Sequence, residues 1–190
     1  MMKRNNFPFS AVLGLNHAKT AILIVLVNPR AGGLLISGPR GIGKSTLMRS
    51  TQELIERPWR DIPVSVTEDR LFGTIDTEKA IYSGQKKLYP GIINEADQGV
   101  LYLDDANLLR EDLLDFILNI AEVGAYQLER DGLSLRCDTS FTVIAAINPE
   151  SGMLSGACLD QFGLFVNVDN IHDENTRVEI LKRTISFEKD

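Results

Sequence analysis

Residues 38–45 read Gly38-Pro39-Arg40-Gly41-Ile42-Gly43-Lys44-Ser45 and match the pattern G-x-x-x-x-G-K-[ST] at every fixed position. The glycines allow the backbone to wrap around a phosphate chain, whose oxygens would face the N–H groups at the start of the next helix. Lys44 would reach the β- and γ-phosphates, and the Ser45 hydroxyl would bind Mg²⁺. A glycine-rich turn with a chance lysine is the alternative. This loop, however, follows an apolar strand and precedes a helix, as a phosphate-binding loop must.

ATP and Mg²⁺ are therefore the expected ligands of this loop. The residues expected to surround the phosphates are Gly38, Pro39, Arg40, Gly41, Ile42, Gly43, Lys44, Ser45 and Thr46.

A second apolar strand, residues 99–103, ends in two carboxylates, Asp104 and Asp105. Asp104 would hold Mg²⁺ through water, and Asp105 would polarise the water that attacks the γ-phosphate. Alone, a strand that ends in Asp-Asp is often only a helix cap. Beside a phosphate-binding loop, the same pair indicates ATP hydrolysis.

A third apolar strand, residues 142–147, ends in Asn148-Pro149. The Asn148 amide would orient the attacking water, although a simple Asn-Pro turn is the alternative. Ligand sites in parallel sheets lie at the carboxyl ends of the strands. We therefore expect Gly38, Asp104 and Asn148 to converge at one edge of the sheet.

Apolar strands alternate with helical segments along the whole chain, which predicts an α/β fold with three layers: a central parallel sheet flanked by helices. Asn16 is expected to cap the first helix, which would bury Ala18, Ala21, Ile22, Val25 and Leu26. Asp131-Gly132 predicts a β-hairpin over residues 126–136, and residues 71–73 look like a loop. The other predicted helices are 44–57, 76–83, a short one after Pro90-Gly91, one carrying Leu109, Leu113, Phe116, Ile117 and Ile120 on one face, and one from Asp173; the other predicted strands are 33–37, 63–66 and 164–168.

Composition limits the classes of function. The 190 residues suit one domain, and the net charge of −6, from 20 basic and 26 acidic side chains, argues against nucleic-acid binding. The apolar run 21–27 is too short to cross a bilayer, so no membrane insertion is expected. Cys137 and Cys158 form no metal-binding pattern with the two histidines. They are expected to be reduced thiols of a cytoplasmic protein.

Longer blocks around these motifs resemble the I-type ATPase subunit of magnesium chelatase, a member of the AAA+ ATPases. The similarity covers nearly the whole chain in the same order, and residues 67–76 and the hairpin are its most specific parts. The blocks that carry it are 7–14, 28–33, 67–76, 99–104, 107–109, 129–132, 148–150 and 159–164.

The resemblance implies an AAA+ core with a hairpin inserted before the strand that ends in Asn148. It also implies a ring, of one or two kinds of AAA+ subunit, that works with other chelatase-type subunits. In the family, the ring and a porphyrin-binding subunit insert Mg²⁺ into protoporphyrin for chlorophyll biosynthesis. On this resemblance, Val12, Leu13 and Gly14 would border the adenine pocket.

Departures from the family pattern are informative. Asp105 stands where the family has glutamate, and Leu15 replaces a glutamine. Gln161 replaces the arginine of Leu-Asp-Arg-Phe-Gly that reaches a neighbour's γ-phosphate. We therefore expect slow hydrolysis by the chain alone, unless Arg70, Arg130 or Arg136 takes that role. The chain ends where the family's helical lid should begin. Residues 1–190 are thus expected to form a single AAA+ core, lacking the C-terminal lid, of a truncated or shortened relative.

Three functions remain open on the sequence. The first is an ATP-hydrolysing motor subunit of a magnesium-chelatase-like complex. The second is a nucleotide-binding scaffold in a mixed ring that hydrolyses ATP poorly. The third is a MoxR-like ATPase chaperone that serves metal or cofactor insertion in another protein.

Overall fold

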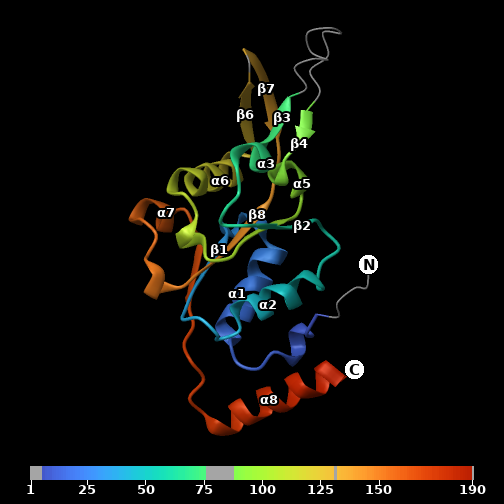
Figure 1. The fold of residues 1–190 in the computed structure, drawn as a ribbon, viewed down its shortest axis with the longest axis vertical. Coiled ribbons are helices and arrows are strands. Elements are labelled where there is room, and N and C mark those ends of the chain that lie inside the picture. The colour runs from blue at the N-terminus through green and yellow to red at the C-terminus, as the bar shows by residue number, and fades with distance from the viewer. Residues whose placement is uncertain (1–5, 76–87, 131, 190) are drawn as a thin grey trace.

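The computed structural model describes residues 6–75, 88–130 and 132–189 (Figure 1). At its centre lies a parallel sheet of five strands in the order β2-β5-β8-β1-β9. The predicted α/β fold with a central parallel sheet is thus confirmed. The strands are β1 (Leu34–Ser37), β2 (Trp59–Ile62), β5 (Val100–Leu103), β8 (Thr142–Ile147) and β9 (Leu164–Asn167).

Helices cover both faces of the sheet, because side chains alternate along each strand. In β8, Ile144 and Ala146 pack with α1 (Asn16–Val27) and α2 (Lys44–Gln52). Val143, Ala145 and Ile147 pack on the other face. The helices on that face are α3 (Glu68–Phe72), α5 (Ile92–Glu95), α6 (Glu111–Val123) and α7 (Gly156–Asp160).

Helix α1 buries the expected face of Ala18, Ala21, Ile22, Val25 and Leu26. The other apolar residues of this helix are exposed to solvent, and Val27 is 85% exposed. Asn16 does not cap the helix as expected. It is the first helical residue and Leu15 holds the cap position in the left-handed region, with no side-chain cap. Within the described ranges, no helix combines the length and apolar character that a membrane-crossing segment needs.

Helix α6 begins with Glu111 and Asp112, whose charges favour a helix N-terminus, and stops at Gly124. One prediction for its buried face was wrong. Phe116 has helical spacing with the core residues, but it is 60% exposed. It packs edge-on against the Phe72 ring at 6.0 Å, so its partner is a neighbouring short helix and not the sheet.

Several expected boundaries also differ. The second strand is β2 and not residues 63–66, and α2 ends at Gln52, short of the expected residue 57. Residues 71–73 are no loop: they end α3 and begin β3 (Gly73–Ile75), which pairs with β4 (Leu88–Pro90). The helix expected at 76–83 lies outside the described residues. Short 3-10 helices span Phe9–Ala11, Pro29–Ala31, Ala106–Leu108 and Pro149–Ser151.

The predicted hairpin is confirmed as β6 (Ala125–Arg130) and β7 (Leu133–Asp138), which pair antiparallel. Together with β3 and β4 it projects from the end of the molecule opposite to α8 (Glu174–Lys189), as Figure 1 shows. Helix α8 follows β9 after a connecting segment and packs on the N-terminal segment. Its Phe187 ring lies 5.3 Å from Phe7, and Arg183 Nη1 donates to Ala11 O at 3.2 Å.

Candidate nucleotide-binding site

The loop 38–43 joins the end of β1 to the start of α2, as the sequence predicts. Gly43 precedes the helix with φ of 92°, in the left-handed region that glycine adopts without strain. At Gly38, a Cβ would lie 2.4 Å from Val168 O, so the backbone passes too close to its neighbour for any side chain. The loop is therefore shaped by its glycines, and the N–H groups at the start of α2 face outward along its axis.

Lys44 is buried, with 8% of its surface exposed. Its Nζ donates to Gly38 O at 2.6 Å and to Pro39 O at 2.9 Å. Burial lowers the pKa of Lys44, an effect that the negative charges of Asp105 and Asp104 oppose. Lysine is seldom buried unless an anion accompanies it. An ammonium held by two neutral carbonyls at a helix start is suited to phosphate oxygens.

Ser45 and Asp104 meet beside this loop. The Ser45 Oγ donates to Asp104 Oδ2 at 2.9 Å, across a separation of 59 residues. Hydroxyl and carboxylate oxygens are hard donors that suit Mg²⁺, which usually binds one or two carboxylates, phosphates and several waters. No cluster of three or more His, Cys, Asp or Glu ligands exists in the described part of the chain. The pair therefore fits a metal that shares its coordination with a nucleotide.

Asp105 follows in a left-handed conformation, with φ of 49° and ψ of 47°. Aspartate is among the few residue types that tolerate this region. Its side chain does not cap the short helix that it precedes, so the helix-cap alternative is not realised. Instead, Asp105 Oδ2 lies 3.9 Å from Arg40 Nη2 of the loop. The second carboxylate thus stands next to the phosphate-binding loop.

Asn148 lies at the same edge, since β8 is the neighbour of both β5 and β1. The expected convergence of Gly38, Asp104 and Asn148 is thereby confirmed, and Gly38 N donates to Ile147 O at 3.2 Å. The Asn148 side chain is engaged in its own turn: Oδ1 accepts from Glu150 N and Nδ2 donates to Ser151 Oγ, each at 3.2 Å. Asn148 as a whole is 2% exposed, and the turn holds its amide in one orientation.

The segment expected to border adenine follows the 3-10 helix Phe9–Ala11, which packs against α2. Val12 is buried with Ala18 in the core on the α1 side, and Leu13 and Gly14 are half-buried. Lys19 Nζ donates to Val12 O and lies 5.5 Å from the Phe9 ring. Ile171, from the connection to α8, packs beside Gly14. These contacts hold the segment between α1 and the connection to α8.

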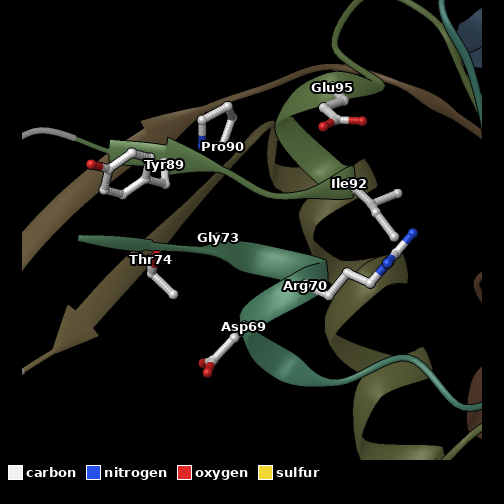
Figure 2. A pocket seen from close by; sticks show the side chains of 8 residues that line it. All are labelled: Asp69, Arg70, Gly73, Thr74, Tyr89, Pro90, Ile92 and Glu95. Atoms are coloured by element: carbon white, nitrogen blue, oxygen red, sulfur yellow. The ribbon is translucent and has the colours of Figure 1, made fainter. Parts of the chain in front are cut away.

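Gln161 ends α7, and its Nε2 donates to Ala157 O at 3.4 Å. Of the three arginines named as substitutes, Arg136 pairs with Asp138 in the hairpin at 2.9 Å. The Arg130 side chain lies outside the part of the chain that the structure describes. Arg70 lines a pocket of about 360 Å³ at β3 and β4, and Figure 2 shows Arg70 extending beside Ile92. The pocket is lined by Asp69, Arg70, Gly73, Thr74, Tyr89, Pro90, Ile92 and Glu95, and by no residue of the loop 38–43.

Sequence reasoning missed two residues near the site. Asn107 Nδ2 donates to Asn148 O at 3.1 Å and to Gly152 O at 3.0 Å, which ties the end of β5 to the end of β8. Tyr102 buries its hydroxyl beside Asp104. Burial raises the pKa of Tyr102 far above its ordinary value, and the charge of Asp104 raises it further, so the phenol stays protonated. In the sequence, Tyr102 looks like one more apolar strand residue.

Comparison with known proteins agrees with this geometry. A family model described as "AAA domain (dynein-related subfamily)" matches residues 33–161. The magnesium-chelatase 38 kDa subunit of Cereibacter sphaeroides is 36% identical over 97% of this chain and 65% of its own length. Magnesium-chelatase subunit ChlI of Cyanophora paradoxa is 33% identical over 99% of this chain and 67% of its own.

A solved structure of the complex between subunits BchI and BchD of magnesium chelatase, based on cryo-EM, is also similar. It matches 96% of this chain and 67% of the solved chain, with a TM-score of 0.81 and 36% identity. The chain spans about two thirds of the length of these relatives.

Proposed function

Since the chain belongs to the AAA ATPases and is a homologue of magnesium-chelatase I subunits, we propose that it binds ATP with Mg²⁺ at the loop 38–43. The observation that carries this proposal is the buried Lys44 ammonium, held only 2.6 and 2.9 Å from two loop carbonyls. The Ser45–Asp104 pair stands beside it. A buried cation and two hard oxygen donors together suit a nucleotide polyphosphate and its metal.

The chain's residues divide the hydrolytic work between them. Lys44 would exchange its carbonyl partners for the β- and γ-phosphate oxygens. Asp105 would accept a proton from water as the water oxygen attacks the γ-phosphorus, and the bond from that phosphorus to the bridging oxygen breaks to give ADP and phosphate. Asn148, held by its own turn, would orient this water with the second hydrogen of its amide Nδ2. Mg²⁺, bound through Ser45 and Asp104, would neutralise phosphate charge.

At the level of the assembly, we propose a chelatase-type role: ATP binding and hydrolysis coupled to Mg²⁺ insertion into protoporphyrin. The partners would be an AAA+ ring, of this chain alone or mixed, and further chelatase-type subunits. Support comes from the relatives, which are named as magnesium-chelatase subunits, and from the similar solved structure, which is a complex of two such subunits.

One observation favours a second candidate, a scaffold subunit that binds ATP but hydrolyses it poorly. Gln161 is neutral and donates to Ala157 O within its own helix. A neutral amide does not offset the charge that spreads over the γ-phosphate during transfer. In a mixed ring, such a subunit would hold nucleotide while a different subunit supplies turnover.

The proposed binding site is tested with Lys44→Ala. We expect loss of detectable fluorescent-nucleotide binding, because the mutant lacks the only lysine of residues 38–46. Lys182→Ala, at an exposed position on α8, is the matched control and should bind like the wild type. If Lys44→Ala bound the fluorescent nucleotide as tightly as the wild type, the proposed nucleotide-binding site would be wrong. ATPase assays with and without chelatase-type partner subunits then separate a motor, which partners stimulate, from a scaffold.

A further inference from the structure

A cavity of about 390 Å³, lined by both apolar and polar side chains, lies between α2 and the strands β2 and β5. It adjoins the Ser45–Asp104 pair, since both residues form part of its wall. The nucleotide-binding chemistry described above leaves the rest of that wall unused. The residues that matter here are Ser45, Met48, Trp59, Asp61, Tyr102 and Asp104.

The sheet places three of these side chains on one face. Asp61 pairs with Tyr102 in the parallel register of β2 and β5. Trp59 stands two residues before Asp61, on the same face, and its Nε1 donates to Asp61 Oδ1 at 2.9 Å. The Asp61 carboxylate is thereby fixed at the cavity wall by a neighbour from its own strand.

Among the groups that line the cavity, the Tyr102 hydroxyl is unusual because it is buried and makes no hydrogen bond of normal geometry within the described residues. Tyr102 is 5% exposed, and its Oη has no hydrogen-bond partner among the described residues. Asp104 and Ser45 both lie close enough to this hydroxyl for hydrogen bonding to shift its pKa, although neither contact meets strict hydrogen-bond geometry. A buried polar group without a hydrogen bond is destabilising, and phenylalanine would avoid that cost at nearly the same volume. A small adjustment at the metal site would let the hydroxyl donate to Asp104 and accept from a water at the same time.

We propose that Tyr102 is a positioning residue of the magnesium site, and that Asp61 assists it from the same cavity. The Tyr102 oxygen accepts a hydrogen bond from a metal-bound water, and its O–H donates to the Asp104 carboxylate. Bound Mg²⁺ keeps several waters, and groups that hydrogen-bond to its ligands orient them and tune affinity. This inference rests on the proposed function, because it concerns the metal that accompanies the nucleotide.

The test is a Mg²⁺ titration of fluorescent-ADP binding with Tyr102→Phe, which removes a single oxygen. We expect the Mg²⁺ concentration at half-saturation to rise about tenfold, the lower end of the usual effect of such groups on metal affinity. Affinity for the nucleotide in EDTA should match the wild type. A purely structural role for Tyr102 would change the melting temperature and leave the Mg²⁺ midpoint where it was.

Tyr126→Phe is the matched control. It also removes a partly buried tyrosine hydroxyl, one that lies 2.7 Å from Phe72 O and from Asn94 Oδ1, away from the cavity. Its Mg²⁺ midpoint should equal that of the wild type. Asp61→Asn is the second variant, since an exposed side chain can be changed without unfolding the protein, and it should raise the midpoint as well.

The outcomes are distinct. If wild-type protein shows no Mg²⁺-dependent nucleotide binding, the proposed function fails. If it does and folded Tyr102→Phe keeps the wild-type midpoint, only the present inference is overturned. Should Tyr102→Phe not fold, an unchanged midpoint in Asp61→Asn overturns it instead.

Discussion

The nucleotide edge of the sheet and the hairpin end are held together in different ways. At the edge, Ser45 and Asp104 meet although 59 residues separate them, and the parallel strands that bring them there pair only across long connections. In the hairpin, β6 pairs with β7 directly across one turn, from Ala125↔Asp138 to Arg130↔Leu133. The edge therefore depends on the whole sheet, whereas the hairpin closes locally. Changes at one should leave the other intact.

The largest effect is expected at the edge, from Gln161→Arg in a form of the protein that assembles into rings. An arginine supplied to a neighbour's γ-phosphate is worth about 10³–10⁵ in turnover. We expect the wild-type chain to bind ATP and hydrolyse it very slowly. The turnover of the variant should be higher by a factor in that range. Steady-state phosphate release measures both, and hairpin-dependent partner binding should not change.

A wild-type rate near or above about one per second, an ordinary enzymatic value, would contradict this. Another residue would then do the work assigned to the family's arginine. Arg70 is the first to examine by substitution, since Arg136 is paired with Asp138.

A comparison of stability sharpens the contrast between sheet and hairpin. Ile144 is fully buried in β8, between β5 and β1, and Ile144→Ala should lower the free energy of unfolding by about 2–5 kcal/mol. Leu135→Ala in the hairpin, where the side chain is half-buried, should lower it by only about 1 kcal/mol. Urea unfolding followed by circular dichroism measures both. Equal losses would show that the hairpin is part of the main core.

The smallest effect on the nucleotide site is expected from removing the hairpin. Ala125 and Asp138 are paired, so residues 126–136 can be replaced by a short glycine-serine link. Nucleotide affinity should stay close to wild type, because no residue of the loop 38–43 lies in the hairpin. Binding to ring or partner subunits should be lost. Intact partner binding after the deletion would refute the hairpin's proposed role.

The strands predicted well from sequence are those buried on both faces. β1, β5 and β8 are continuous apolar runs, and every residue of each is buried. The misplaced strand, β2, is an edge strand in which Arg60 and Asp61 are exposed between Trp59 and Ile62. Residues 63–66 look more apolar than that, which explains the error. Whether a strand lies at the edge of the sheet depends on the order of the strands. That order cannot be predicted from the sequence of any one strand.

The candidate site divides in the same way. The pattern of residues 38–45 and the two carboxylates after β5 are local signals, because phosphate and metal chemistry restricts which residue types can serve. Phe116 shows the limit of such local signals. Its helical spacing predicts burial in the core, but its side chain lies at the surface and contacts the ring of Phe72, which comes from a distant segment. Its environment was decided by which neighbouring helix packed against it.

The sequence by itself determined the phosphate-binding loop, the α/β alternation and the hairpin turn, since each follows from short-range sterics or from residue chemistry. Only the tertiary structure decided that Asp105 takes a left-handed conformation beside Arg40. It also decided that Tyr102 faces α2 and buries its hydroxyl beside Asp104. Alternation along a strand assigns residues to two faces. Which face meets the metal-binding helix depends on the order of the strands and on the packing of α2 against them.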